Sequence, residues 1–180
     1  MIPVITPAGA DTYLRIHKSF VMLGKLTMPE IEKLLRKEVL GRIGCTDGDV
    51  VYVVPISYVY DGEYIYCHTH EGLKVDIMRK HKKVCFEVDS LRNMANWQSV
   101  VVQGEFEELT DPALRSHALQ RLHERILPMP SSETAHLSAD WPFPPAEFNK
   151  IAGITFRIRL MEKTGRFEKS PASAITFYGI

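Results

Sequence analysis

The feature that most constrains the fold is a pair of β-strand patterns in the first half of the chain. A long run of β-branched and aromatic residues, Val50–Tyr60, precedes an Asp61-Gly62 pair and a second run, Tyr64–His68. An Asp-Gly pair between two such runs is the strongest short-range signal for a β-hairpin. We therefore expect two antiparallel strands here.

The longer of these strands is apolar on both faces. A strand with this pattern is covered on both sides. We expect the barrel interior to cover one face and a helix or a second subunit to cover the other. The two sets are Val54, Ile56 and Tyr58 on one face, and Val51, Val53 and Val59 on the other.

The rest of the pattern alternates between strand and helix periods. Short strands with Asp-Gly turns and few helices favour a mainly β, antiparallel barrel with helices at its ends. Gly104 inside a strand suggests a bulge or a bend, and residues 1–26 suggest a strand-poor arm. The predicted helices are 28–39, 72–81 and 110–127, the further strands are 42–46, 83–88, 97–109 and 151–161, residues 128–147 form a loop, and the tail has no clear period.

Composition bounds the class of protein. The 180 residues suggest one domain, 1–180, with its core over about 25–162. Basic and acidic residues number 22 each, so the net charge is zero. No basic excess indicates nucleic-acid binding, and charge repulsion does not oppose self-association. Three cysteines without C-x-x-C spacing predict buried or half-buried thiols in a reducing cytoplasm. We see no signal peptide and no membrane span.

A polar turn follows the hairpin and could bind phosphate. Thr69, Gly72 and Lys74 lie where a strand ends and a helix begins. Helix-start N–H groups attract anions, glycine lets the backbone approach, and lysine adds a charge. The alternative is an ordinary lysine that is solvated at the surface.

Pro55 lies in the middle of the long strand, where a proline cannot donate to the hydrogen-bond ladder. It therefore predicts an edge or a bulge, with backbone groups free for a flat heterocycle and the Ser57 hydroxyl nearby. An ordinary edge strand is the alternative.

Other polar clusters carry weaker signals. His68 and His70 share a strand face, but no second cluster completes a metal site, so we predict none. Glu87 and Asp89 share a face and are expected to be solvent-exposed. Trp97 suggests core or subunit interface more than ligand stacking. No nucleophile–base frame is present, so the catalytic residues stay unassigned.

Taken in order, these segments resemble the FMN-binding split-barrel family related to pyridoxamine 5′-phosphate oxidase, in its nitroimidazole-reductase-like branch. The resemblance covers about residues 25–110, and residues 1–20 and 128–148 add nothing to it. It rests on Gly41–Gly48, Tyr52–Gly62, Ile65–Lys74, Val84–Asp89 and Asn96–Gly104, with a weaker match over Ile154–Gly165.

The resemblance implies a six-stranded split β-barrel with flanking helices that forms a homodimer with two FMN sites at the interface. Val54, Pro55, Ile56 and Ser57 would line the isoalloxazine and ribityl side, and His68, Thr69, Leu73 and Lys74 the phosphate end. Ser99 and Trp97 lie in a further strand that lines the flavin, from either subunit. The oxidase itself has an arginine within the strand that here reads Val53–Ser57, and an Arg-Lys pair in place of Leu73-Lys74.

The function implied is that of a cytoplasmic FMN-dependent oxidoreductase that reduces a small nitroaromatic or quinone-like acceptor. No Rossmann fingerprint is present, so a nicotinamide donor, NAD(P)H, would bind transiently. Two alternatives stay open. One is a non-catalytic flavin carrier or sensor, and the other is a haem-binding split barrel that uses His68 or His70.

Overall fold

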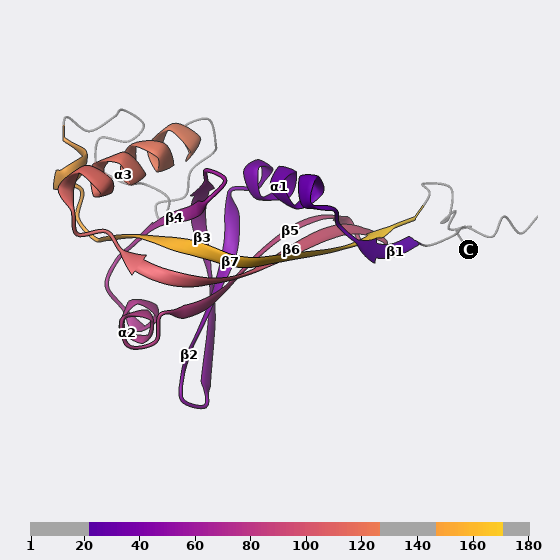
Figure 1. The fold of residues 1–180 in the computed structure, drawn as a ribbon, viewed down its shortest axis with the longest axis horizontal. Coiled ribbons are helices and arrows are strands. Elements are labelled where there is room, and N and C mark those ends of the chain that lie inside the picture. The colour runs from indigo at the N-terminus through magenta and orange to yellow at the C-terminus, as the bar shows by residue number, and fades with distance from the viewer. Residues whose placement is uncertain (1–21, 127–146, 171–180) are drawn as a thin grey trace, which may run out of the picture.

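A computed structural model describes residues 22–126 and 147–170 (Figure 1). Its centre is an antiparallel sheet with the strand order β1-β7-β4-β3-β2-β5-β6. The strands are β1 (Met22–Lys25), β2 (Leu40–Asp47), β3 (Val50–Tyr60), β4 (Tyr64–Thr69), β5 (Lys83–Asn93), β6 (Asn96–Glu108) and β7 (Ile154–Lys169).

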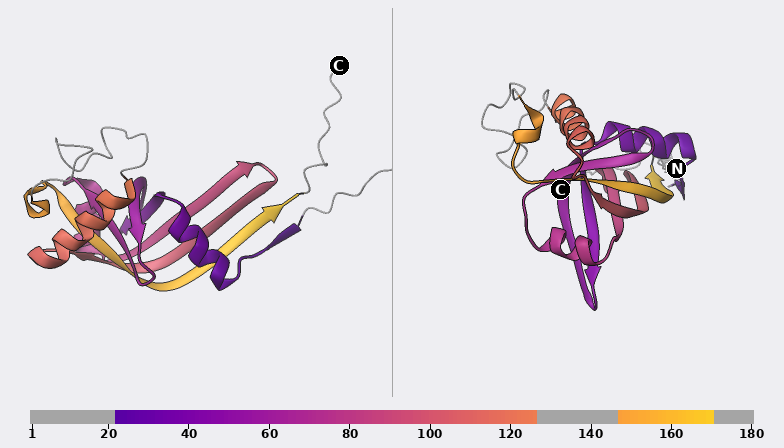
Figure 2. Two further views of the ribbon diagram at one scale, coloured as in Figure 1. Left: turned by 90° about the horizontal axis from the view of Figure 1, so that it is seen from above. Right: turned by 60° about the vertical axis from the view of Figure 1, so that its left-hand side comes forward.

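The sheet closes on itself because β6 also pairs with β7. Six strands, β2 to β7, therefore form a ring, which confirms the predicted six-stranded barrel. The short β1 was not predicted and adds a seventh strand to the sheet by pairing with the far end of β7. Beyond the barrel, β5, β6 and the end of β7 continue as a long arm (Figure 2).

Three α-helices and a short 3₁₀ helix flank the described part of the barrel. They are α1 (Met28–Lys37), α2 (Leu73–Lys80), α3 (Pro112–Ile126) and η2 (Phe148–Lys150). A capping box starts α1, since the Glu30 carboxylate accepts from the Thr27 N–H at 2.8 Å. In Figure 1, α1 and α3 lie above the sheet, and α2 lies below β7 and to the left of β2.

The barrel interior holds large aromatic side chains. Tyr58 and Phe86 are fully buried and meet edge to face, with ring centroids 5.1 Å apart. The Tyr58 hydroxyl donates to the Leu35 carbonyl at 2.9 Å, which satisfies its polar end and ties α1 to the barrel. Burial raises the pKa of Tyr58 far above its usual range.

One face of β3 is covered as the sequence predicts, and the other face is covered at one end only. Val54, Ile56 and Tyr58 pack toward the barrel core. On the other face, Val59 is buried beneath α3, with Ala118 and Leu122 in the same cluster. Further along that face, Val51 and Val53 are 71% and 57% exposed.

Several boundaries differ from the predicted ones. The last strand runs to Lys169 rather than to residue 161, and β5 continues to Asn93. These polar extensions carry no clear period, but their backbones pair with β6 over almost its full length. The strand at Met22–Lys25 corrects the expected strand-poor arm over its last residues. Residues 1–21, the predicted loop at 128–146 and the tail from 171 lie outside the described residues.

The predicted bulge and the predicted burial of the thiols are confirmed. The register of β6 against β7 shifts between Gln103 and Gly104, where we predicted a bulge. Cys45 and Cys67 are buried and Cys85 is half-buried, and all three are free thiols. Among the described residues, no helix is long and apolar enough to cross a membrane. No group of three or more His, Cys, Asp or Glu residues in this part of the chain could hold a metal ion.

Candidate functional site

One edge of β3 has no strand partner in the described part of the chain. Over Val50–Ser57, β3 pairs with β2 on one side only. Its pairing with β4 is confined to Tyr58–Tyr60, so the sheet is split beside the earlier residues. Pro55 lies within this stretch, opposite Arg42 of β2. The edge position predicted from Pro55 is confirmed.

The four predicted residues of this edge point in alternate directions. Val54 and Ile56 turn their side chains toward the barrel core. Pro55 is exposed and Ser57 is half-buried on the opposite face. A ligand at this edge would therefore meet backbone N–H and C=O groups, together with the Ser57 hydroxyl.

The start of α2 presents backbone donors. Gly72 caps the helix with φ 155° and ψ −179°, a conformation that essentially only glycine adopts. Its carbonyl accepts from Val75 and Asp76, whereas the N–H groups at the very start of a helix have no intrahelical partner. Leu73 is 55% exposed at this end, and apart from Gly72 and its two chain neighbours no described residue has an atom within 4 Å of where a Gly72 Cβ would be. The predicted phosphate turn is thus open.

Lys74 brings a positive charge close to the split. It is half-buried, and it forms no ion pair or hydrogen bond with another described residue. Burial raises the pKa of the Cys45 and Cys67 thiols, and the charge of Lys74 opposes that rise in both. Cys45 belongs to β2 and Cys67 to β4, the strands on either side of β3. Lys74 therefore acts on both neighbours of the free edge.

Thr69 and His68 end β4 differently. Thr69 is half-buried at the last position of the strand, opposite Ile154. The His68 ring faces β7, with Nδ1 3.2 Å from Thr155 Oγ1. Burial, aided by the charge of Arg115, lowers the pKa of His68 to about 4. His68 is consequently neutral at physiological pH and adds no positive charge for a phosphate.

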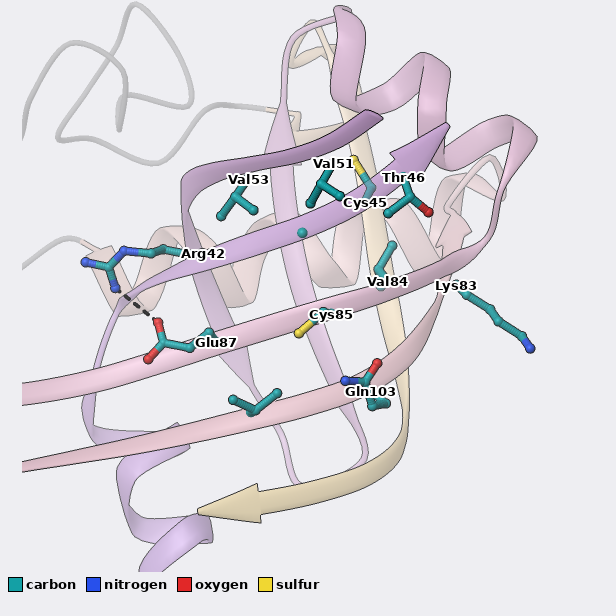
Figure 3. A pocket seen from close by; sticks show the side chains of 12 residues that line it. Arg42, Cys45, Thr46, Val51, Val53, Lys83, Val84, Cys85, Glu87 and Gln103 are labelled. Carbon is teal, nitrogen blue, oxygen red and sulfur yellow. Dashed lines mark hydrogen bonds and ion pairs between the residues drawn. The ribbon is translucent and has the colours of Figure 1, made fainter. Parts of the chain in front are cut away.

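A groove of about 570 Å³ runs across the outer face of β2, β3, β5 and β6 (Figure 3). The side chains of Val51 and Val53 form one wall, and Cys85 lies on its floor. None of the ten predicted site residues lines it. The signal in the sequence was the outward set of the long strand, which did not by itself indicate a groove. The lining is Arg42, Gly44, Cys45, Thr46, Val51, Val53, Lys83, Val84, Cys85, Glu87, Val101 and Gln103.

Ser99 and Trp97 lie on β6, remote from the free edge of β3. The register places Pro55, Arg42, Glu87 and Val101 side by side across four strands. Three strand spacings amount to about 14 Å. Ser99 lies two residues beyond Val101, and the Trp97 indole N–H donates to Glu168 Oε2 at 2.9 Å. A single chain therefore does not bring these residues to the edge.

The two carboxylates expected in solvent are engaged instead. Arg42 Nη1 lies 3.1 Å from Glu87 Oε2 and also bonds the carboxylate of Asp89. Both acidic residues are half-buried. The expectation of exposure was wrong because β2, which carries Arg42, pairs beside β5.

The sequence of this chain matches the model of the pyridoxamine 5′-phosphate oxidase family over residues 27–166. The chain belongs to the pyridoxamine 5′-phosphate oxidase family. An uncharacterized protein of Rhizobium meliloti (strain 1021) is 32% identical over 127 residues, which are 71% of this chain and 83% of that protein. The family resemblance deduced from the hairpin and its neighbours is confirmed.

Solved structures share this fold. A FAD-binding protein of Mesorhizobium loti superposes with a TM-score of 0.62 at 28% identity, covering 83% of this chain and 99% of the other. A proposed 5-nitroimidazole antibiotic resistance protein of Bacteroides thetaiotaomicron gives 0.63 at 17% identity, covering 84% and 90%. At that identity the second likeness shows the fold alone. The split-barrel prediction is confirmed, whereas the individual flavin contacts stay predictions.

Proposed function

We propose that this member of the family is an FMN-binding oxidoreductase. The observation that carries the proposal is the unpaired edge of β3, together with the open start of α2, whose Lys74 acts on Cys45 and Cys67 in the strands on either side of β3. The edge offers backbone donors and acceptors of the kind that a heterocycle with imide-like edges requires. Lys74, Thr69 and the first-turn N–H groups offer what a phosphate monoester requires.

The residues present fit FMN in charge as well as in shape. Lys74 has no acidic partner among the described residues, so its charge is available to a phosphate. His68 is neutral, which leaves Lys74 and helix dipoles as the main electrostatic attraction. FAD-binding proteins of this fold exist, so the choice between FMN and FAD has to be measured.

A second copy of the chain completes the site in this proposal. The groove side chains Val51 and Val53 are largely exposed, and a zero net charge opposes no self-association. Ser99 and Trp97 lie too far from the β3 edge of their own chain, so we assign them to the flavin of the partner. The site is incomplete without the homodimer.

Bound FMN supplies the hydride and electron transfer, which the chain cannot supply itself. The β3 backbone, Ser57 and the start of α2 hold and orient the cofactor, and the subunit interface excludes water. We propose a small nitroaromatic or quinone-like compound as electron acceptor. A nicotinamide donor would bind transiently. The cytoplasmic location predicted from the cysteines stays a prediction.

Anaerobic mixing tests the catalytic part of this proposal. The FMN-loaded protein is mixed with NADH or NADPH, and bleaching of the flavin is followed before a nitroaromatic compound is added. If the protein is an oxidoreductase, the donor bleaches the bound flavin, and each addition of the nitroaromatic compound restores its colour. A flavin that stays oxidised with both donors would show a carrier or sensor instead.

A further inference from the structure

The hydrogen-bonding direction of one hydroxyl beside the groove is fixed by its neighbours. The Ser99 hydroxyl donates to Glu87 Oε1 at 2.7 Å. A hydroxyl has one proton to donate and two lone pairs with which to accept. Because the proton is committed to Glu87, any further partner of Ser99 must bring its own donor.

Arg42 binds the other oxygen of the Glu87 carboxylate and so holds Glu87 as an acceptor for Ser99. Its Nη1 lies 3.1 Å from Glu87 Oε2, the carboxylate oxygen that Ser99 does not use. Each oxygen of Glu87 thus has a separate donor. An ionised carboxylate only accepts hydrogen bonds, so Glu87 cannot reverse the direction of the bond with Ser99.

The hydroxyl lies beside the groove, on the face that we assign to the subunit interface. Glu87 and Val101 are paired across β5 and β6, and both line the groove. Ser99 is two residues from Val101, on the same face of β6. Figure 3 shows the Arg42–Glu87 pair at one end of the groove, away from Thr46 and Lys83.

We propose that Glu87 is a positioning residue, which presents the Ser99 hydroxyl as an acceptor for an N–H group of the isoalloxazine ring held at the β3 edge of the partner subunit. The inference rests on the proposed function. The ring carries one imide N–H when oxidised and gains further N–H groups on reduction. A hydroxyl that accepts a hydrogen bond from the imide N–H stabilises the oxidised and the reduced flavin alike. A hydroxyl that accepts from an N–H formed on reduction stabilises the reduced flavin alone.

Glu87→Gln tests the direction of the bond without changing the volume of the side chain. Arg42 has only donors, so the Gln amide oxygen turns toward Arg42 and its NH₂ group toward Ser99. Ser99 must then accept from the amide and point its proton at the ligand. Asp89→Asn is the matched control, because it removes the same charge from the same arginine. Asp89 lies opposite Ser99 on the neighbouring strand, but the Ser99 hydroxyl donates to Glu87 and not to Asp89.

The measurements are the dissociation constant of oxidised FMN and the midpoint potential of the bound flavin. Glu87→Gln and Ser99→Ala are each expected to weaken FMN binding by roughly three- to tenfold. The double variant should bind FMN about as weakly as either single variant, because both substitutions remove the same hydrogen bond. Asp89→Asn should bind as wild type does. An unchanged dissociation constant with a lowered potential assigns the contact to an N–H formed on reduction.

Two results overturn the inference. One is a Glu87→Gln variant whose flavin affinity and potential both equal those of wild type. The other is an Asp89→Asn variant that is as weak as Glu87→Gln, which would show that the charge matters rather than the direction of the bond. A wild-type dimer that binds no flavin at all overturns the proposed function together with this inference.

Discussion

The two ends of the outer face of β3 have the same kind of sequence but different covers. At one end Val59 is buried with Tyr66 beneath Leu122 of α3. At the other end Val51 and Val53 stand beside an open groove. The apolar pattern therefore indicates that a face will be covered, but it does not say whether the cover comes from the same chain. We interpret the first end as structural and the second as an interface.

Leu122→Ala tests the covered end and should have the largest effect. Leu122 is 1% exposed, and truncating a fully buried leucine costs about 2–5 kcal/mol. Urea denaturation should show this loss, whereas Gln120→Ala on the exposed side of α3 should stay within about 0.5 kcal/mol. A Leu122→Ala variant as stable as the wild type would mean that α3 does not cover this face in solution.

Burial of His68, on the neighbouring strand β4, should make stability depend on pH. Burial lowers the pKa of His68 to about 4 from 6.5, so the unfolded chain takes up this proton first as pH falls. The free energy of unfolding should therefore fall between about pH 6.5 and 4, by up to roughly 3 kcal/mol. His68→Gln should flatten this part of the curve, measured by urea denaturation at each pH. Parallel curves for the two proteins would place His68 in solvent.

Lys74→Ala tests the ligand that we assign to the open side. A charge-assisted hydrogen bond is worth roughly 1.5–3 kcal/mol, so the variant should bind FMN more weakly by about one to two orders of magnitude. Fluorescence titration with FMN measures this, with Lys33→Ala on the exposed side of α1 as the control. Equal affinity in wild type and Lys74→Ala would remove Lys74 from the site.

Val53→Asp tests the open end itself. The side chain is 57% exposed in the single chain, so the variant should fold with nearly wild-type stability. At a dimer interface the buried carboxylate should weaken association by at least about tenfold. Sedimentation velocity across a concentration series would show this, and Leu114→Asp on α3 is the control. A Val53→Asp dimer as tight as the wild type would contradict the assigned interface.

Much of the fold could be predicted from local signals, and the failures have a common cause. The β3–β4 hairpin follows from Asp61-Gly62 and from alternating apolar residues, and the helices follow from caps and period. The second half of β7 and the strand β1 could not be predicted, because they are held by backbone pairing with distant strands. Their polar side chains alternate too weakly to indicate a strand.

The candidate site divides in the same way. The edge position of Pro55 and the open turn at Gly72 follow from single residues whose backbone requirements are strict. The partners of Glu87 could not be predicted, because Arg42 and Ser99 reach it through strand register across β2, β5 and β6. Exposure of a carboxylate depends on such neighbours rather than on its own residue type.

The visible absorption spectrum of the purified protein, followed by titration with FMN, FAD and haem, tests the central claim most directly. The account predicts a flavin spectrum, or its appearance on addition of FMN, with one flavin bound per chain of a dimer. A colourless protein that binds no flavin would contradict it. A Soret band on addition of haem would assign the site to a different cofactor.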